Sequence, residues 1–207
     1  VLVSFASLIF MRPVAEKIGL VDKPNFRKRH QGLIPLIGGI ALFLGNLTFY
    51  AFQYDTMPLP GLYLLSVTIL LFIGVLDDRF DISPALRAGI QAVLAGAMIY
   101  SGLELESLGQ IIAPFSIKLG FFSLLFTVFI TIGVINAFNM VDGIDGLLAG
   151  LSSVSFAGIG VLMWINGEHA IAFWCLAIIL TLIPYAMFNL SVFGAKWKVF
   201  MGDSGST

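Results

Sequence analysis

Seven long apolar stretches divide this chain of 207 residues, with only short polar breaks between them. A helix needs about 17–25 apolar residues to cross a bilayer, and every stretch after the first has that length. Hydrophobic residues make up 58% of the chain and charged residues 11%, far from the balance of a soluble domain. We therefore expect an all-α, polytopic membrane protein with the apolar stretches Val1–Met11, Ile34–Gln53, Leu59–Leu76, Ala85–Leu103, Phe121–Met140, Leu147–Ile165 and Ala170–Leu190.

The chain has the features of one integral-membrane domain over residues 1–207, because glycines and prolines are scattered rather than gathered in a linker. The first stretch has neither an initiator methionine nor a basic region before it, unlike a cleaved signal peptide. We expect the domain to be incomplete at both ends. Between the fourth and fifth stretches, Glu104–Gly120 alternates loosely around Pro114, which predicts a small hairpin.

Basic residues gather on one side of the predicted membrane. When successive breaks alternate between the two sides, ten of the 11 Lys and Arg residues fall on one side and Lys118 alone on the other. Basic residues favour the cytoplasmic side, so we expect the N-terminus outside. The cytoplasmic breaks also hold every motif suited to catalysis. The ten basic residues are Arg12, Lys17, Lys23, Arg27, Lys28, Arg29, Arg79, Arg87, Lys196 and Lys198.

The first motif is the acidic cluster DDRFD at residues 77–81, directly after the third stretch. Adjacent carboxylates at a membrane boundary repel each other unless a cation compensates, which makes the cluster a candidate site for Mg²⁺ or phosphate chemistry. If the next helix begins at the cluster, Asp77 and Asp81 share one face while Asp78 points elsewhere. The alternative is a solvated acidic turn before that helix.

The second motif consists of four oxygen-bearing side chains at a spacing of three: Asn136, Asn139, Asp142 and Asp145. On a continuous helix this spacing places them along one slowly drifting stripe, and the neighbouring glycines allow a ligand to approach the backbone. Amide and carboxylate oxygens suit a hard cation and the donors of a nucleotide. The alternative, a polar helix cap followed by a glycine turn, explains Asp142 but not all four.

The third motif, FMGDSGS at residues 200–206, follows the seventh stretch. Its glycines can expose backbone N–H groups to a phosphate, Asp203 offers a metal ligand, and Phe200 offers a face on which a base can stack. Gly-Asp-Ser-Gly turns are common in proteins, so this motif is weak in isolation. Neither a P-loop nor a dinucleotide-binding fingerprint accompanies it.

The fourth motif is the basic segment RKRHQG at residues 27–32, in the first cytoplasmic break. Topology alone explains a basic cluster at this place. Its functional interpretation is a clamp for a lipid phosphate or a diphosphate, made by Arg27, Lys28 and Arg29.

The four motifs resemble the polyprenyl-phosphate N-acetylhexosamine-1-phosphate transferase family, and the likeness runs through almost the whole chain in the family's order. Residues 33–39 lack the TPTMGG-like stretch of the family's peptidoglycan branch, and Asp81 stands near the position of a lysine of that branch. The resemblance therefore implies the branch that transfers N-acetylglucosamine 1-phosphate from UDP-GlcNAc to undecaprenyl phosphate, releases UMP, and begins the synthesis of O-antigen and enterobacterial common antigen. The resembling segments are RKRHQGLIPLIGG (27–39), GVLDDRFDISPALR (74–87), NAFNMVDGIDGLLAG (136–150) and VFMGDSGS (199–206).

The resemblance also implies roles for individual residues. Asn139 and Asp203 are expected to coordinate Mg²⁺, with Mn²⁺ as a substitute. Asp77 and Asp78 are expected to act at the reacting phosphates, with their separate roles left open, and Arg87 takes the place of a phosphate-contacting basic residue. The nucleotide pocket is expected to include Phe200, stacked on uracil, together with Asn136, Asp142 and Asp145.

The implied enzyme works at the cytoplasmic face of the bacterial inner membrane, in contact with membrane lipid. It binds no nucleic acid, and whether it forms a homodimer is left open. A single displacement is favoured, with a covalent intermediate on Asp77 or Asp78 as the alternative. A Mg²⁺-dependent membrane prenyltransferase would also use Asp pairs but would not need the third motif. A transporter would place ionisable residues near the bilayer midplane. The family carries a further histidine- or arginine-containing loop beyond Thr207, so we expect part of the site to be missing.

Overall fold

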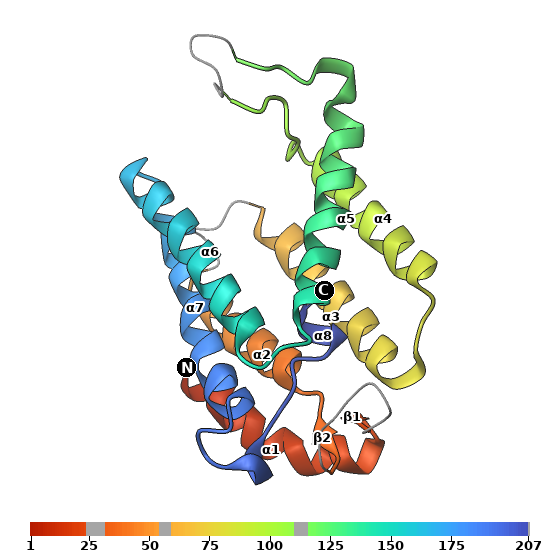
Figure 1. Ribbon diagram of the computed structural model, residues 1–207. Helices are drawn as coiled ribbons and strands as arrows, with labels where there is room; N and C mark the ends of the chain where they lie inside the picture. Colours follow the sequence, from red (N-terminus) through yellow and green to blue (C-terminus); the bar gives the residue numbers. More distant parts are fainter. Residues whose placement is uncertain (24–31, 54–58, 110–115, 207) are drawn as a thin grey trace. The chain divides into compact units, whose positions relative to one another are not determined.

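A computed structural model describes residues 1–23, 32–53, 59–109 and 116–206 (Figure 1). Each of the seven apolar stretches forms a helix, as the sequence predicts. The first helix is longer than its apolar stretch and ends at Gly19, whose φ of 73° lies in the left-handed region that favours glycine. The helices are α1 (Leu2–Ile18), α2 (Gly38–Gln53), α3 (Pro60–Phe80), α4 (Pro84–Tyr100), α5 (Ser123–Val141), α6 (Leu147–Ile165) and α7 (His169–Asn189).

Four helices among the described residues are long and apolar enough to cross a membrane: α3, α6, α7 and Gly120–Val141, which joins the short turn η2 (Gly120–Phe122) to α5. The helices α1, α2 and α4 contain 16 or 17 residues each. At 1.5 Å per residue they extend about 25 Å, less than the ~30 Å of a typical hydrocarbon core. The described part of the chain is therefore that of an all-α membrane protein apart from one short pair of strands, while the seven crossings and their orientation stay predictions.

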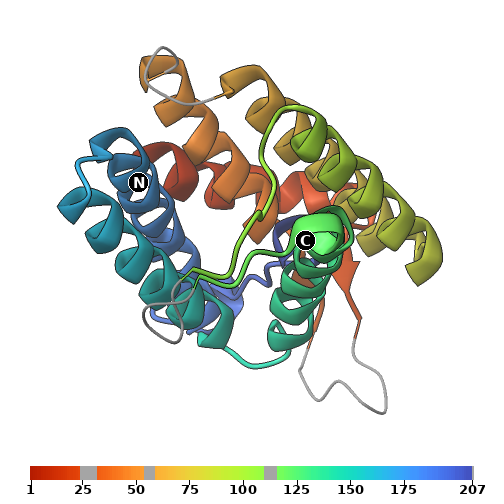
Figure 2. The same cartoon turned by 90° about the horizontal axis from the view of Figure 1, so that it is seen from above.

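Residue contacts divide the chain into two compact units: unit 1 contains Val1–Asp81 and Phe138–Thr207, and unit 2 contains Ile82–Ala137. In unit 1, α6 runs alongside α7 in both views, and α2 packs against α1 and α7 (Figure 1, Figure 2). One group of buried side chains in its core is Leu8, Ala15, Leu20, Ile37, Ala41, Phe188 and Val199. A second group is Leu148, Ala149, Leu182, Tyr185 and Met201. Both groups include residues that adjoin or belong to the third motif.

The beginning of α2 is hydrogen-bonded to the first residues of the third motif. The strand β1 (Val21–Asp22) pairs antiparallel with β2 (Ile34–Pro35). Directly after β2, Leu36 forms a parallel bridge with Phe200, and the Gly38 N–H donates to the Phe200 carbonyl at 3.1 Å. Two segments that are far apart in the sequence therefore form one small ladder beside the candidate site.

Unit 2 contains α4, a hairpin and most of α5. The flanks of the hairpin pair antiparallel through a bridge between Ser107 and Lys118, and the Leu108 N–H donates to the Ile117 carbonyl at 2.9 Å. The prediction of a small hairpin is confirmed for these flanks. Its tip, at residues 110–115, lies outside the described residues.

Candidate functional site

The adjacent acids of the first motif lie in the last turn of α3. This helix continues to Phe80, so Asp77 and Asp78 are inside a helix rather than after one. Asp81 lies outside it: its φ of 55° is left-handed, its side chain is exposed, and its N–H donates to the Asp77 carbonyl at 2.8 Å. The expected shared face of Asp77 and Asp81 is therefore not formed, because α4 begins only at Pro84.

Asp78 binds the backbone of the third motif. Its carboxylate oxygens accept hydrogen bonds from the N–H groups of Asp203, at 2.7 Å, and Ser204, at 3.1 Å. These two residues begin the short helix α8 (Asp203–Ser206), and the first N–H groups of a helix have no acceptor within it. Charge-assisted bonds to a carboxylate are stronger than neutral ones. The residues Gly202–Ser206, which we call the α8 turn, are thus fixed to α3.

Asp203 is in direct contact with Asn139, its predicted partner in metal binding. Asn139 lies in the last turn of α5, which belongs to unit 1. Its side-chain amide donates to the Asp203 carboxylate and, at 3.0 Å, to the Ser206 hydroxyl. The Ser206 hydroxyl in turn donates to the Gly202 carbonyl at 3.0 Å. The α8 turn therefore both carries Asp203 and orients the amide beside it.

The second motif does not form a continuous helical stripe. The helix α5 ends at Val141, and residues 142–146 form a turn, which we call the DGIDG turn. The prediction of one stripe is wrong because glycine favours turns over helix interiors, and Gly146 has a left-handed φ of 74°. Asp142 instead reaches the α8 turn, where its carboxylate accepts the Gly202 N–H.

The carboxyl group of Asp142 is partly buried and lies close to two other acids. Burial and, to a lesser degree, the charges of Asp203 and Asp78 raise the pKa of Asp142 to about 7, although the Gly202 N–H acts in the opposite direction. Three acidic groups are thus concentrated around one turn. Such a concentration of negative charge favours a bound cation.

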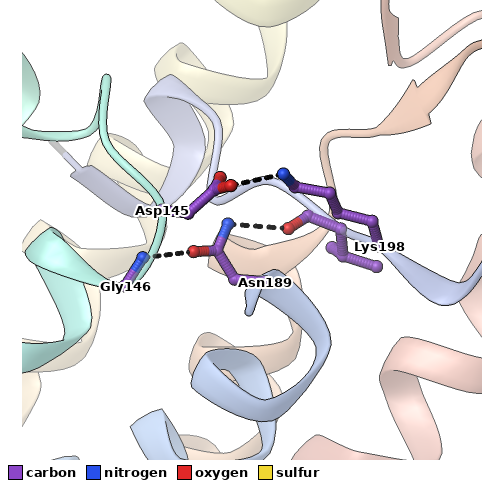
Figure 3. A network of polar contacts seen from close by, with 5 residues as sticks. Asp145, Gly146, Asn189 and Lys198 are labelled. Atoms are coloured by element: carbon purple, nitrogen blue, oxygen red, sulfur yellow. Dashed lines mark hydrogen bonds and ion pairs between the residues drawn. The ribbon is translucent and has the colours of Figure 1, made fainter. Parts of the chain in front are cut away.

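A second set of contacts fixes the DGIDG turn to the end of α7 (Figure 3). The side chain of Asn189 accepts the Gly146 N–H at 2.6 Å and donates to the Val199 carbonyl at 3.0 Å. Beside it, Asp145 forms an ion pair with Lys198. Asn189 is 3% exposed, whereas the side chains of Asp145 and Lys198 are 47% and 20% exposed. The buried amide therefore anchors the turn more firmly than the ion pair near the surface.

Phe200 is partly buried, and the Lys198 ammonium lies 5.4 Å from the centre of its ring. A cation over an aromatic face is attracted by the electrons of the ring. Lys198 thus contacts Asp145 and lies over Phe200, two residues predicted to bind the nucleotide. Its position indicates that these two residues belong to the same end of the site.

Other predicted site residues lie elsewhere in the chain. Arg87 is in the first turn of α4, and the Asn136 side chain donates to the Gln91 side chain at 3.0 Å. These residues belong to unit 2, so the geometry of unit 1 includes neither Arg87 nor Asn136. The clamp residues Arg27, Lys28 and Arg29 lie outside the described residues. Unit 1 brings together the remaining ones: Asp77, Asp78, Asn139, Asp142, Asp145, Phe200 and Asp203.

Several residues that shape the site were not predicted from the sequence. Asn189 is a polar residue at the end of an apolar helix, and this position is the signal that points to a role at backbone atoms. Two glycines allow the α8 turn to approach α2 and α3. A Cβ added at Gly39 would lie 2.3 Å from the Gly205 nitrogen, and one at Gly74 would lie 2.4 Å from the Ser204 Cα. Neither position has room for a side chain.

The oxygen donors of the site fit a magnesium ion. Mg²⁺ usually binds one or two carboxylates together with water and substrate phosphates. Asp203 supplies a carboxylate, Asn139 an amide, and Asp142 a second carboxylate close by. Among the described residues, no group of three or more His, Cys, Asp or Glu side chains is arranged to enclose a metal.

Comparison with known proteins gives the class of the protein and its relatives. The chain belongs to glycosyl transferase family 4, whose family model matches residues 61–207. It is similar to the undecaprenyl-phosphate alpha-N-acetylglucosaminyl 1-phosphate transferases of Haemophilus influenzae and Pasteurella multocida, each 61% identical over 206 residues, which are 99% of this chain and 58% of the relative. The protein of the same name from Escherichia coli strain K12 is 53% identical over 201 residues, 97% of this chain and 55% of the relative. The chain spans a little over half the length of these curated relatives, and the family resemblance of its four motifs is confirmed.

Proposed function

We propose that the protein transfers N-acetylglucosamine 1-phosphate from UDP-GlcNAc to undecaprenyl phosphate and releases UMP. The α8 turn is the observation that carries this proposal: its backbone is bound by Asp78 and Asp142, and its Asp203 side chain contacts Asn139. Oxygen ligands around one fixed turn suit a metal-bound diphosphate. The names of the relatives, which specify an undecaprenyl-phosphate acceptor and an N-acetylglucosaminyl 1-phosphate group, support the same reaction.

The reaction is a displacement at phosphorus. An oxygen of the lipid phosphate bonds to the phosphorus that bears the sugar, the bond from this phosphorus to the bridging oxygen breaks, and UMP leaves with that oxygen. The second pKa of a phosphate monoester is about 6, so the lipid phosphate is largely dianionic near pH 7 and needs no strong base. Bringing two anions together is the harder task, and it depends on positioning and charge stabilisation.

The residues of unit 1 divide this task between a metal end and a nucleotide end. At the metal end, Asp203 and Asn139 would hold Mg²⁺, with Mn²⁺ as a substitute; the ion supplies positive charge to the diphosphate. At the nucleotide end, Phe200 would stack on uracil, and Asp142 and Asp145 would line the pocket.

The family resemblance gives roles in the proposed reaction to further residues. It assigns the pair Asp77 and Asp78 to the reacting phosphates and Asn136 to the nucleotide. Arg87 and the basic residues Arg27, Lys28 and Arg29 offset the charge of the lipid phosphate. Because the two substrates differ in solubility, the site has to lie at a membrane surface that a soluble nucleotide sugar can reach.

We place this surface on the cytoplasmic side of the bacterial inner membrane, with seven crossings and the N-terminus outside. The ten-to-one asymmetry of basic residues supports this orientation. Cysteine scanning of intact cells in a Cys175→Ser background tests it. Cysteines at positions 118 and 169 should react with an impermeant reagent, and those at 142 and 203 should react only after the membrane is opened. Labelling of position 142 from outside contradicts the proposal.

A transfer assay tests the function itself. Membranes that hold the full-length protein are incubated with undecaprenyl phosphate and UDP-GlcNAc labelled in the sugar, in the presence of Mg²⁺ or EDTA. We expect label in the lipid phase, one UMP for each labelled lipid, and no transfer in EDTA. Release of UDP in place of UMP would mean that the sugar moves without its phosphate, and the proposal would then be wrong.

A further inference from the structure

The adjacent carboxylates Asp77 and Asp78 have different surroundings. Successive residues of an α-helix project about 100° apart, so the two side chains leave α3 in different directions. Asp78 directs both carboxylate oxygens at backbone N–H groups, those of Asp203 and Ser204. Asp77 is buried, with 6% of its surface exposed. The two residues are of the same type, but their side chains are therefore in different environments.

The face of α3 that carries Asp78 is shaped to receive the α8 turn. Gly74 lies one helical turn before Asp78 on the same face, and a Cβ there would lie 2.4 Å from the Ser204 Cα. From the opposite side, Gly202 has a φ of 76°, and a Cβ there would lie 2.5 Å from an Asp78 carboxylate oxygen. Both distances are too short for a real side chain. Glycine is therefore required at both positions for the bonds of Asp78 to form.

These bonds act on the expected metal ligand through its own backbone. One donor is the N–H of Asp203 itself, and the other is the N–H of the next residue. Fixing both N–H groups restricts the rotation of the Asp203 backbone, from which the carboxylate that contacts Asn139 projects. Two hydrogen bonds from adjacent N–H groups to one side chain therefore fix this backbone.

We propose that Asp78 is a positioning residue for Asp203, so that the two acids of the pair have different roles. The proposal rests on the proposed function in one respect, because that function assigns Asp203 to the metal. Asp78 keeps the carboxylate of Asp203 in contact with the amide of Asn139. Loss of Asp78 therefore loosens the α8 turn, weakens metal binding, and lowers the rate through these two effects.

Hydrogen exchange and Mn²⁺ binding test this role without reference to turnover. The two variants Asp78→Asn and Asp77→Asn are measured as full-length proteins in detergent. The amide of Asp78→Asn keeps one acceptor oxygen but sets an NH₂ group against the second N–H, so one bond is lost with little change in volume. We expect exchange in a peptide that covers residues 202–206 to become about tenfold faster, and Mn²⁺ binding, followed by electron paramagnetic resonance, to become about tenfold weaker. Asp77→Asn should leave both within about twofold while its turnover falls.

Gly202→Ala tests the same bonds from the opposite partner and serves where Asp78→Asn does not fold. The new Cβ displaces the Asp78 carboxylate, so we expect the same faster exchange and weaker Mn²⁺ binding with Asp78 intact. Gly194→Ala is the matched control. Gly194 also has a positive φ, 92°, but a Cβ there has no atom within 4 Å. The Gly194→Ala substitution introduces backbone strain without a steric clash, so hydrogen exchange across residues 202–206 should remain that of the wild type.

Two further outcomes are decisive. If Asp78→Asn abolishes turnover while exchange and Mn²⁺ affinity match the wild type, Asp78 acts directly on the substrate and the proposal is overturned. If the wild type binds no Mn²⁺, the metal assignment in the proposed function fails. The exchange measurement then still decides whether Asp78 fixes the α8 turn.

Discussion

The α8 turn and the DGIDG turn hold acids of the same kind by different means. In the α8 turn, main-chain N–H groups bind Asp78, and glycines of α2 and α3 enclose the backbone. In the DGIDG turn, Ile144 is 66% exposed, Asp145 pairs with a lysine side chain, and the buried Asn189 is the anchor. Main-chain contacts leave fewer rotatable bonds than contacts between long side chains. The geometry of the site is therefore set mainly by the α8 turn, and the DGIDG turn has more freedom.

The largest expected difference lies between Asp203→Asn in the α8 turn and Phe200→Ala just before it. Asp203→Asn removes an anionic metal ligand, so kcat should fall at least about 100-fold at saturating UDP-GlcNAc, with weaker Mg²⁺ dependence and partial rescue by Mn²⁺. Phe200→Ala removes a stacking face and should raise KM about tenfold with a smaller effect on kcat. Steady-state kinetics of the full-length variants measure both. If Asp203→Asn keeps its kcat and Mg²⁺ dependence, the acids at residues 77–81 become the better metal site.

One glycine in each turn tests how much the close packing around the backbone contributes to stability and turnover. A Cβ at Gly205 would lie 2.5 Å from the Gly39 Cα, whereas one at Gly143 has no atom within 4 Å. Overpacking costs about 1–3 kcal/mol, so Gly205→Ala should lower the Tm by about 5 °C and turnover at least tenfold. Gly143→Ala should change the Tm by no more than about 1 °C. Thermal unfolding and transfer rates in detergent compare the two, and equal effects would remove the distinction between the turns.

The buried anchor of the DGIDG turn should matter more than its surface contacts. Asn189→Leu keeps a similar volume but leaves the Gly146 N–H and the Val199 carbonyl without this partner, at a cost of about 1–3 kcal/mol for each group. We expect a lower Tm and a KM for UDP-GlcNAc raised about tenfold. Asn166→Leu is the control, because Asn166 is exposed and bonds to the Leu162 carbonyl of its own helix. A KM unchanged in Asn189→Leu would show that the position of this turn does not affect the nucleotide.

The ion pair of Asp145 and Lys198 should have a small effect. Partly exposed ion pairs contribute about 0–1 kcal/mol, so Lys198→Gln should leave the Tm within about 2 °C and raise KM only about two- to fivefold. A double-mutant cycle with Asp145→Asn measures the coupling directly. The coupling should decrease further in about 0.5 M salt. A coupling above about 2 kcal/mol would mean that this surface pair stabilises the turn as much as the buried Asn189 does.

The smallest effect concerns pH in the absence of metal. Asp142 has a pKa of about 7 in the fold, against about 3.9 in an unfolded chain, so the folded state binds more protons between these values. In EDTA, the stability of the fold should therefore fall as pH rises from about 4 to about 7. Asp142→Asn should flatten this dependence, which denaturation at several pH values measures. A wild-type stability that rises over this range would mean that Asp142 is ionised in the fold.

The helices and the chemical character of the site were predictable, but the contacts between motifs were not. Long apolar stretches specify α5 and α7 directly, and the spacing of acids and amides indicates oxygen chemistry. The bond between Asp78 and the Asp203 N–H joins residues 125 positions apart, and periodicity within one helix carries no information about such a pair. The predicted stripe through Asp142 failed for a local reason, because its spacing fits a helix but its glycines end one.

The ladder that joins the beginning of α2 to Phe200 has a consequence for biosynthesis. The ribosome produces Leu36 and Gly38 long before Phe200, which is their partner in the ladder. The first helices are therefore made before these backbone groups can form their hydrogen bonds. Closing a loop of this length costs entropy before any contact compensates for it, and contacts between distant residues slow folding. The order of synthesis therefore means that the candidate site cannot assemble before residues 200–206 have been made.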